Sequence, residues 1–291
     1  MYKYSFIIPH KNCPDLLQRC VDSIPEREDV QVIVVDDNSD ADKKPQLSRK
    51  DVEVILLDAE HSKGAGRARN VGLQHAKGKW LLFADADDYY TDYLPMLLNK
   101  YVDDARTDIV YLNACIFDEN GNERPHEAAG LIINFLKGNK GAEMHLRYSI
   151  WTPWTRMVKR HVVERYQISF DEIPACNDKM FCLLCSYYAK TIDAESKVIY
   201  KYFKPTTGSQ TDKNRNHLMF EGLLIVRCRT IDLYRKTGYK PIPSLLDLFS
   251  KSKYTAGLSK RQIIKKYFEN LSKAHVFFLR DIFRFIFHKL K

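Results

Sequence analysis

The chain has 291 residues, of which 45% are hydrophobic and 29% charged, a composition typical of a globular protein with a sizeable core. This composition excludes a disordered chain, a collagen and a small disulfide-stapled domain. The length is compatible with one large domain or with two modest ones.

The net charge of +9 is unevenly distributed along the chain. Residues 1–250 contain 35 Lys and Arg against 35 Asp and Glu, whereas residues 251–291 contain 11 against 2. Nucleic-acid-binding proteins usually spread basic side chains over a folded face and carry a recognition motif, and this sequence has no such motif. The basic excess therefore indicates a property of the C-terminal segment, and we expect no nucleic-acid partner.

Short apolar runs alternate with amphipathic stretches in the first half of the chain. Strands are predicted at residues 4–9, 30–36, 52–57, 80–84 and 109–117, and helices at residues 15–24 and 66–76. This β-α-β-α order predicts a mostly parallel sheet with helices on its faces. Ligands bind such sheets outside the carboxyl ends of the strands, so the polar residues that end those strands are the candidates for function.

The pattern loosens after an exposed turn at residues 118–123. A loop contains Trp151 and Trp154, an amphipathic helix is predicted at residues 178–189, and the chain turns helical from His217 onward.

The seven cysteines are odd in number and scattered, and the first strand begins at once, without a signal peptide, so we expect a reduced cytoplasmic protein. Cys182 and Cys185 form a C-x-x-C pair without a second pair at a zinc-site spacing, which favours buried helix cysteines over a metal or redox site. The longest apolar runs fall short of the roughly 20 residues that cross a bilayer.

Three of the predicted strands end in polar clusters, at residues 10–12, 36–40 and 85–88. Carboxylates gathered at one sheet edge repel one another unless a cation lies among them, and Mg²⁺ or Mn²⁺ prefers oxygen ligands and leaves room for a diphosphate. Alternatively, Asp and Asn simply end strands and cap the helices that follow.

Four segments together, in this order, resemble the family 2 glycosyltransferases, which are inverting enzymes with the glycosyltransferase-A fold. They are Phe6–Pro9 with Asn12, Val32–Asp40, Gly64–Gly72 and Gly78–Asp88, and the resemblance covers residues 3–117 almost continuously. It implies an α/β fold of glycosyltransferase-A type, a nucleotide-sugar donor and a divalent cation, Mn²⁺ or Mg²⁺.

The resemblance also implies roles for individual residues. Pro9 and Asn12 line the nucleotide pocket, Asp37 contacts the base, and Arg69 lies near the nucleotide. Asp85 and Asp87 form the D-x-D pair, in which Asp87 binds the metal and Asp85 lies near the ribose and the metal-bound waters. The chain departs from the family pattern at His10 and Lys11, where a small residue and an aromatic are usual.

The segment from Pro153 to Arg160 and the one around Phe170 resemble the acceptor side of the family. They lead to an acidic pair that reads Asn177-Asp178 here. An inverting transfer needs a carboxylate that takes the proton of the acceptor hydroxyl, and Asp178 is the predicted base. The alternatives are Asp171 or Glu172 as the base, and Asp178 as an ordinary helix N-cap.

Two further residues are weaker candidates for the acceptor side. Trp154 either walls the sugar site or anchors a loop, and Ser209 lies in a segment that resembles the one closing the catalytic domain and approaching the diphosphate.

From Val276 to Leu290 apolar residues occupy most positions, many of them phenylalanines, while Arg280, Arg284 and His288 form a narrow polar stripe joined by Asp281. Further cations lie just upstream, at residues 260–273. This pattern fits a helix lying on an anionic membrane surface; the alternative is a core or dimer helix.

We therefore predict a catalytic domain at residues 1–210, whose nucleotide-sugar-binding half ends at residue 117, and a helical extension at residues 211–291. The expected reaction is the transfer of a sugar from a nucleotide donor to a glycan or lipid-linked acceptor at the inner membrane face. The resemblance implies that this donor is UDP-linked. The alternatives are a non-catalytic sugar- or membrane-binding relative and a sugar-phosphate nucleotidyltransferase.

Overall fold

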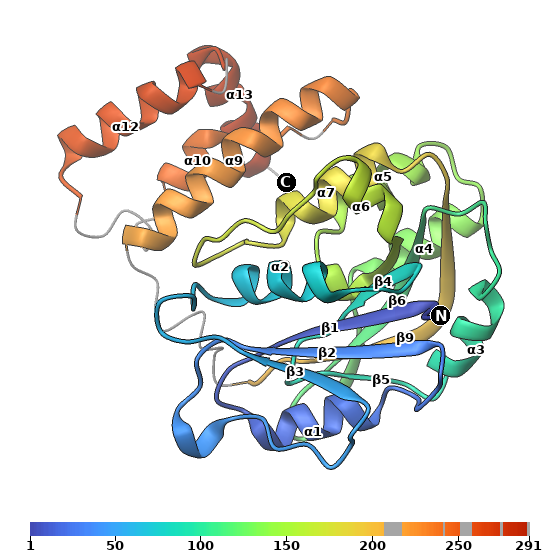
Figure 1. The fold of residues 1–291 in the computed structure, drawn as a ribbon. Coiled ribbons are helices and arrows are strands. Elements are labelled where there is room, and N and C mark those ends of the chain that lie inside the picture. Colours follow the sequence, from blue (N-terminus) through green and yellow to red (C-terminus); the bar gives the residue numbers. More distant parts are fainter. Residues whose placement is uncertain (207–216, 241, 251–257, 274–275, 290–291) are drawn as a thin grey trace. The chain divides into compact units, whose positions relative to one another are not determined.

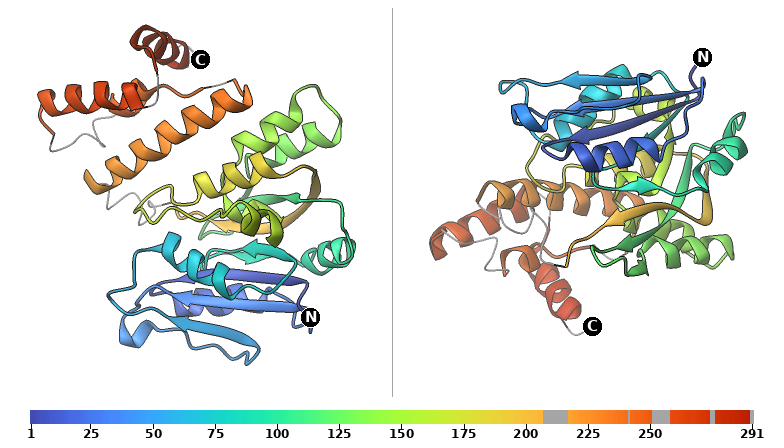
Figure 2. Two further views of the ribbon diagram at one scale, coloured as in Figure 1. Left: turned by 45° about the horizontal axis from the view of Figure 1, so that its top comes forward. Right: turned by 90° about the horizontal axis from the view of Figure 1, so that it is seen from below.

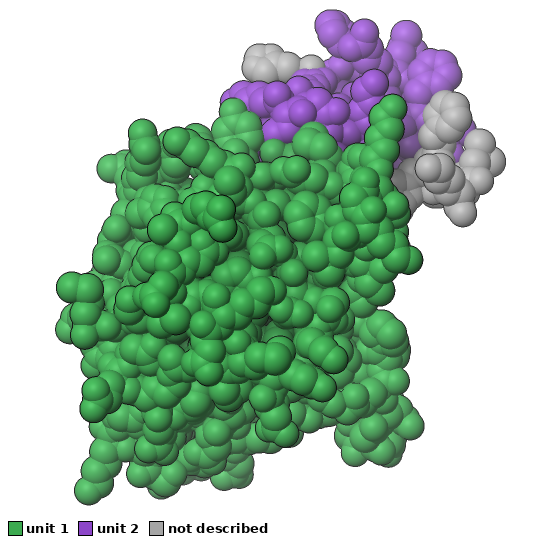
Figure 3. All heavy atoms as spheres, turned by 90° about the vertical axis from the view of Figure 1, so that its right-hand side faces the viewer, with its two compact units in different colours: residues 1–172, 177–207 green, residues 173–176, 208–291 purple. Residues whose placement is uncertain are grey.

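A computed structural model of the chain describes residues 1–206, 217–240, 242–250, 258–273 and 276–289. The chain divides into two compact units (Figure 3). Unit 1 consists of residues 1–172 and 177–207, and unit 2 of residues 173–176 and 208–291. Each unit has its own hydrophobic core.

Unit 1 is built on one nine-stranded sheet with the strand order β3-β2-β1-β4-β8-β6-β9-β5, in which β7 pairs with β6. The strands are β1 (Tyr4–His10), β2 (Val30–Asp36), β3 (Val52–Leu56), β4 (Trp80–Phe83), β5 (Tyr89–Tyr90), β6 (Ile109–Phe117), β7 (Glu123–Pro125), β8 (Arg156–Lys159) and β9 (Ile192–Phe203).

The centre of the sheet is β1, which pairs in parallel with β2 and β4. All seven residues of β1 and of β2 are buried, as expected for parallel strands covered on both faces. The next strand, β8, runs antiparallel to both β4 and β6, so β6 and its parallel neighbour β9 regain the direction of β1. The carboxyl ends of β1, β2, β4, β6 and β9 therefore lie at the same edge of the sheet.

Helices cover both faces of this sheet (Figures 1 and 2). One core cluster joins α1 (Pro14–Asp22) and α3 (Leu94–Tyr101) to one face. A second cluster joins five helices to the other face: α2 (Ala65–His75), α4 (Ala128–Leu136), α5 (Ala142–Ser149), α6 (Arg160–Arg165) and α7 (Lys179–Tyr188). Short 3-10 turns, η1 (Ala41–Lys43) and η2 (Pro153–Thr155), complete the unit.

Unit 2 is helical in its described residues. It contains α9 (His217–Thr237), α10 (Leu245–Phe249), α12 (Lys260–Lys273) and α13 (Phe278–Lys289). Residues of α9, α10 and α12 share a core around Phe220, Leu248 and Tyr267.

The expected α/β fold with flanking helices and C-terminal helices is confirmed, and the sheet is parallel where the sequence predicts it. The sheet as a whole is mixed, because β8 lies antiparallel between β4 and β6. Cys182 and Cys185 are buried in α7, and burial raises the pKa of the Cys182 thiol to about 12 and that of Cys185 still higher, so both remain protonated.

Candidate functional site

The first two strands end in a buried hydrogen-bond network. His10 Nδ1 lies 2.7 Å from Asp36 Oδ1, and both side chains are almost completely buried. The Cys13 N–H donates to His10 Nε2 (3.2 Å), so the ring proton is on Nδ1, facing the carboxylate. Ser39 donates to Asp36 through both its hydroxyl (2.5 Å) and its backbone N–H (3.0 Å). The network joins the two loops that follow β1 and β2.

Replacing His10 with alanine is expected to destabilise the protein by about 2–4 kcal/mol, because the buried Asp36 carboxylate would lose a partner. Urea unfolding followed by circular dichroism measures the change. The matched control is His61→Ala, which removes an exposed histidine paired with the exposed Asp58 and should cost less than about 0.5 kcal/mol. Equal losses in the two variants would contradict a structural role for this network.

The predicted nucleotide residues of these loops lie together at the same edge. Pro9 is buried near the end of β1. Asn12 adopts a left-handed conformation (φ 58°), and its side chain exchanges hydrogen bonds with Asp40. The Asp37 carboxylate is only 4% exposed, accepts the Gly64 N–H (3.1 Å) and lies 3.5 Å from the ammonium of Lys11. A nucleobase that hydrogen-bonds to the Asp37 carboxylate therefore has to compete with the Lys11 ammonium for it. The sequence did not reveal this pairing of Lys11 with Asp37.

The D-x-D segment follows β4, and its three carboxylates have different surroundings. Asp85 accepts a 2.5 Å hydrogen bond from Arg69. Asp88 is fully buried and accepts from the Tyr200 hydroxyl (2.8 Å) and the Phe203 N–H (2.7 Å), so it serves the structure. Asp87 is half-buried, and no other described side chain donates to its carboxylate. Asp87 is thus the carboxylate of this segment that remains available.

Burial and the neighbouring Asp85 raise the pKa of Asp87 to about 6. Arg19 of α1, whose role has no signal in the sequence, donates to the Asp87 carbonyl (2.6 Å) and lies 5.0 Å from the centre of the Tyr89 ring. The raised pKa shows that burial and the neighbouring carboxylate disfavour the ionised form of Asp87. A bound cation would stabilise that ionised form.

No cluster of three or more His, Cys, Asp or Glu side chains among the described residues is arranged to hold a metal by itself. This agrees with the partners of the D-x-D segment, because Arg69 engages Asp85 and the core engages Asp88. Mg²⁺ and Mn²⁺ in nucleotide sites use one or two carboxylates together with phosphate oxygens and water. The residues present fit a cation of that kind, held by Asp87 and assisted by Asp85.

Helix α2 connects this edge to the segment before α7. Gly66 packs so closely that a Cβ atom there would lie 2.2 Å from the Asp171 carbonyl, which explains a glycine at this position. The Asn70 side chain donates to the Phe170 carbonyl (3.0 Å) and accepts the Phe170 N–H (2.8 Å). Between them, Arg69 is 5% exposed and donates to both Asp85 and Asn177. The sequence pointed to Arg69, but not to Asn70 as an anchor.

Asp178 occupies the N-cap position of α7 but makes no capping hydrogen bond through its side chain. Burial and Asp85 raise the pKa of its carboxyl group, whereas Arg69 lowers it. Glu172, one of the alternative bases, is paired with Arg67 (3.4 Å) and accepts from Asn70 (3.3 Å). Asp178 therefore lies in the electrostatic field of Asp85 and Arg69 and is not used as a side-chain cap.

The prediction that Trp154 offers a face to an acceptor is wrong in this structure. Its ring is 3% exposed and belongs to the core, where it stacks on Tyr200 (centroids 4.9 Å apart) and on Tyr202 (5.1 Å) and meets His126 edge-on (4.9 Å). Aromatic neighbours occupy the ring surface that would pack against a sugar, so Trp154 anchors its loop. Ser209, the other acceptor candidate, lies outside the described residues.

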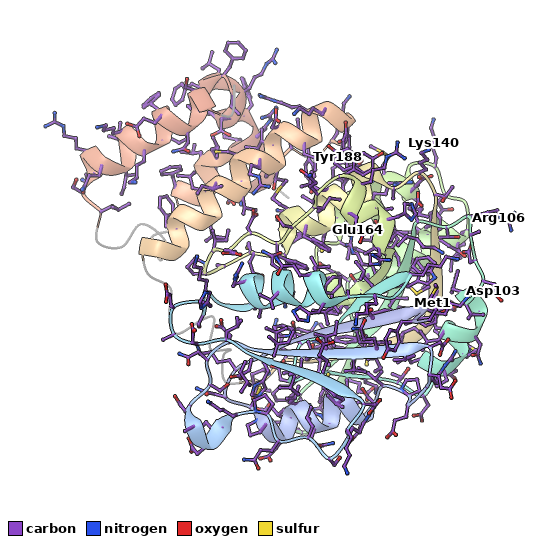
Figure 4. The ribbon with its side chains drawn as sticks, in the orientation of Figure 1. Met1, Asp103, Arg106, Lys140, Glu164 and Tyr188 are labelled. Atoms are coloured by element: carbon purple, nitrogen blue, oxygen red, sulfur yellow. The ribbon has the colours of Figure 1, made fainter. Side chains whose placement is uncertain are left out.

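A cavity of about 810 Å³ lies away from these residues. It is lined by residues 99–107 and 191–193, at the edge where β1 begins, as the 3.3 Å ion pair between Lys3 and Asp103 indicates. Figure 4 labels Asp103 and Arg106 of this cavity on the same side of unit 1 as Met1. We do not assign this cavity as the donor site despite its size, because ligands of such sheets bind at the opposite edge, where the parallel strands have their carboxyl ends.

Residues 5–176 match the family described as glycosyl transferase family 2. The chain belongs to this family. The glycosyltransferase EpsJ of Bacillus subtilis, which is described as uncharacterized, is 23% identical over 210 residues, which cover 68% of this chain and 60% of EpsJ. The chain thus spans less than two thirds of that relative. The family resemblance predicted from the four sequence segments is confirmed.

Solved structures share the fold. The structure of S. aureus TarS residues 1–349 in complex with UDP-GlcNAc superposes with a TM-score of 0.64 at 18% identity, covering 94% of this chain and 80% of that chain. The mannosyltransferase PcManGT from Pyrobaculum calidifontis, in complex with GDP-Man and Mn²⁺, gives a TM-score of 0.54 at 17% identity, covering 94% and 76%. At these identities the likeness concerns the fold alone.

Proposed function

We propose that the chain is an inverting, metal-dependent glycosyltransferase that moves a sugar from a nucleotide donor, UDP-linked, to a hydroxyl of a glycan or lipid-linked acceptor. The observation that carries the proposal is that Asp85 and Asp178 face one buried guanidinium, that of Arg69, while Asp37 and Asp87 follow β2 and β4 at the carboxyl edge of the same sheet. We place the catalytic domain at residues 1–210 and the helical extension at residues 211–291.

Each of the residues at this edge has its own proposed role in binding or catalysis. Pro9, Asn12 and Asp37 hold the nucleoside, and the hydrogen bond from Arg69 holds Asp85 in place beside the diphosphate. Asp178 accepts the proton of the acceptor hydroxyl while the hydroxyl oxygen attacks the anomeric carbon. The attack comes from the face opposite the leaving group, so the configuration inverts. The leaving nucleoside diphosphate takes the bonding electron pair of the cleaved bond.

A divalent cation, when bound, supplies positive charge to the phosphate oxygens of the leaving group. Asp87 is the residue proposed to hold it, because its carboxylate is available and its pKa of about 6 reflects crowding by burial and Asp85. Mn²⁺ accompanies GDP-Man in PcManGT, which supports a cation in this fold.

The names of two similar proteins support the proposed donor and acceptor. TarS was solved with UDP-GlcNAc. The Escherichia coli protein WfaP, 35% identical over 89 residues, is a UDP-Glc:alpha-D-GlcNAc-diphosphoundecaprenol beta-1,3-glucosyltransferase. A UDP-sugar donor and an acceptor that is itself a glycan on a lipid are therefore proposed for this chain.

The test is to incubate the purified protein with a panel of nucleotide sugars and Mn²⁺ and to measure slow release of the nucleotide, with and without a chelator. Chelator-sensitive hydrolysis of one or a few UDP-sugars is expected. Hydrolysis that persists after chelation would contradict the metal, and absence of any hydrolysis or nucleotide binding would favour a non-catalytic relative. Formation of a nucleotide sugar from a sugar phosphate and a nucleoside triphosphate would identify a nucleotidyltransferase instead.

A membrane surface is the proposed partner of α12 and α13. No helix among the described residues is long and apolar enough to cross a bilayer. Exposed apolar side chains nevertheless lie on these two helices and directly before α13: Ile264, Phe268, Phe277, Phe278, Leu279, Phe283 and Ile286. Exposed cations accompany them, at Lys260, Arg261, Lys265 and Arg280.

Asp281, the acidic residue of α13, does not face the proposed membrane surface and so does not repel anionic lipid. Asp281 is fully buried, and its carboxylate accepts the N–H groups of Leu245 (2.8 Å) and Leu246 (2.9 Å) and the Tyr267 hydroxyl (2.8 Å). Because the carboxylate points into unit 2, the exposed face of α13 is apolar and basic, which is complementary to anionic lipid. This corrects the sequence interpretation in which Asp281 joined a polar stripe with Arg280 and Arg284. The proposed location is peripheral, on the cytoplasmic face of the membrane.

Replacing Leu279 and Phe283 with glutamate is expected to reduce flotation with phosphatidylglycerol vesicles at least about tenfold, since two apolar contacts and the charge complementarity are lost together. The matched control replaces Ile133 and Leu136, which are exposed on α4, with glutamate and should float like the parent. If both double variants float equally well, α13 does not bind the membrane.

A further inference from the structure

We propose that Asn177 is a positioning residue, whose side-chain oxygen, held by Arg69, fixes where Asp178 lies relative to Asp85. The catalytic consequence of this inference rests on the proposed function, whereas its structural consequence does not. The proposal gives a role to the residue at which the chain departs from the acidic pair of its family.

The geometry consists of one buried guanidinium with a partner on each side. Nη2 of Arg69 donates to Asp85 Oδ1 (2.5 Å), and Nη1 donates to Asn177 Oδ1 (3.0 Å). Arg69 is 5% exposed and lies 5.4 Å from the centre of the Phe170 ring, so it has little freedom to choose other partners. Asn177, the residue next to the proposed base, is thereby tied through Arg69 to Asp85, the first carboxylate of the D-x-D pair.

Hydrogen bonds to backbone groups also fix the segment that contains Asn177. The Asp171 N–H donates to the Asn177 carbonyl (2.9 Å), and Asn70 holds Phe170 with two hydrogen bonds. These bonds use backbone groups at residues 170, 171 and 177, which remain when the Asn177 side chain is shortened. The hydrogen bond from Arg69 is made by the Asn177 side chain, so shortening that side chain removes it.

The rest of α7 does not depend on Asn177. Arg156 is fully buried and donates to the Cys182 carbonyl (3.0 Å), and Arg147 donates to the carbonyls of Ser186 (2.7 Å) and Ala189 (3.0 Å). Two buried arginines thus fix the middle and the end of the helix from other elements. Loss of the Asn177 side chain should therefore loosen the first turn, where Asp178 lies, and leave the helix in place.

An amide suits this position because of the charges around Arg69. Asp85 and Asp178 already face this one guanidinium. A second hydrogen bond from Arg69 needs an acceptor, and the amide oxygen of asparagine accepts without adding a third negative charge to a buried cluster. A longer acidic side chain would compete with Asp85 for the same donor.

Hydrogen exchange tests the structural consequence without substrate. Asn177→Ala is expected to increase the exchange of a peptide spanning residues 170–182 severalfold, including the amide of Cys182, which donates to the Asp178 carbonyl in the first turn, while peptides of β1 and β4 stay unchanged. The control, Asn120→Ala, removes an exposed asparagine of a turn and should leave residues 170–182 unchanged. Unchanged exchange of this peptide in Asn177→Ala would overturn the proposal, whatever the activity of the chain.

Kinetics test the catalytic consequence. With the UDP-sugar that the parent hydrolyses, Asn177→Ala is expected to lower kcat at least about tenfold and to leave the donor KM within about twofold. Asn177→Asp retains an acceptor for Arg69 but adds a third carboxylate to the cluster, so it should recover only part of kcat. An alanine variant as active as the parent, or an aspartate variant as impaired as the alanine variant, would overturn the proposal. A parent without activity would instead count against the proposed function.

Discussion

Replacing Asp178 with asparagine is expected to lower kcat by about 10²- to 10⁴-fold and to change nucleotide affinity by less than about threefold. The variant keeps the size of the side chain and its hydrogen-bonding oxygen but can no longer take the proton of the acceptor hydroxyl. Steady-state kinetics together with calorimetric titration of UDP separate the two effects.

Asp178 is the carboxylate that we propose for this role. It is at the start of α7 without serving as a side-chain cap, and burial together with Asp85 raises the pKa of its carboxyl group, which makes it a stronger base. Asp171→Asn and Glu172→Gln are the matched controls, because these residues are the alternative bases. A larger loss of kcat in either control than in Asp178→Asn would move the base to that residue.

Replacing Asp87 with asparagine is expected to lower turnover by about 10²- to 10³-fold and to remove most of its dependence on Mn²⁺. The carboxylate of Asp87 remains available, whereas Arg69 engages Asp85 and the core engages Asp88. Turnover measured against Mn²⁺ concentration gives both quantities. A variant with the Mn²⁺ dependence of the parent would contradict Asp87 as the ligand.

The same substitution should raise the thermal midpoint of the metal-free protein at pH 7.5. Because the folded-state pKa of Asp87 is raised to about 6, ionising this carboxyl opposes folding. The penalty is absent below about pH 4, grows between pH 4 and pH 6, as the unfolded chain releases this proton and the folded protein retains it, and is complete above pH 6. Asp51→Asn is the control, and it should instead lower the midpoint slightly, because the hydrogen bond from Arg49 holds the pKa of the Asp51 carboxyl below its usual value.

The first half of the fold could be predicted from the sequence because local signals are strong there. Fully buried parallel strands appear as continuous apolar runs, and β2 (Val30–Asp36) and β6 (Ile109–Phe117) have the predicted bounds. Polar residues directly after such runs mark the carboxyl edge, so Asp37 and Asp85 could be found without coordinates. Their roles in nucleotide and metal binding remain predictions.

Other features could not be predicted because they depend on partners far away in the sequence. The short strand β8 contains Arg156 and Lys159, whose charges hide a strand in which all four residues are buried. Trp154 has the sequence context of a sugar-binding loop, but its stacking partners Tyr200 and Tyr202 come from β9. Asp281 has the spacing of a surface stripe, yet it accepts hydrogen bonds from backbone groups of α10. Periodicity within one helix does not report such contacts.

The most direct test of the central claim is a crystal structure of the protein with UDP and Mn²⁺, with the cation located by anomalous scattering. We expect one manganese peak in contact with the Asp87 carboxylate and the diphosphate, with the uridine beside Asn12 and Asp37 and the Asp178 carboxylate facing the same cavity. A manganese ion bound to UDP away from Asp87, or a nucleotide at another edge of the sheet, would contradict the account.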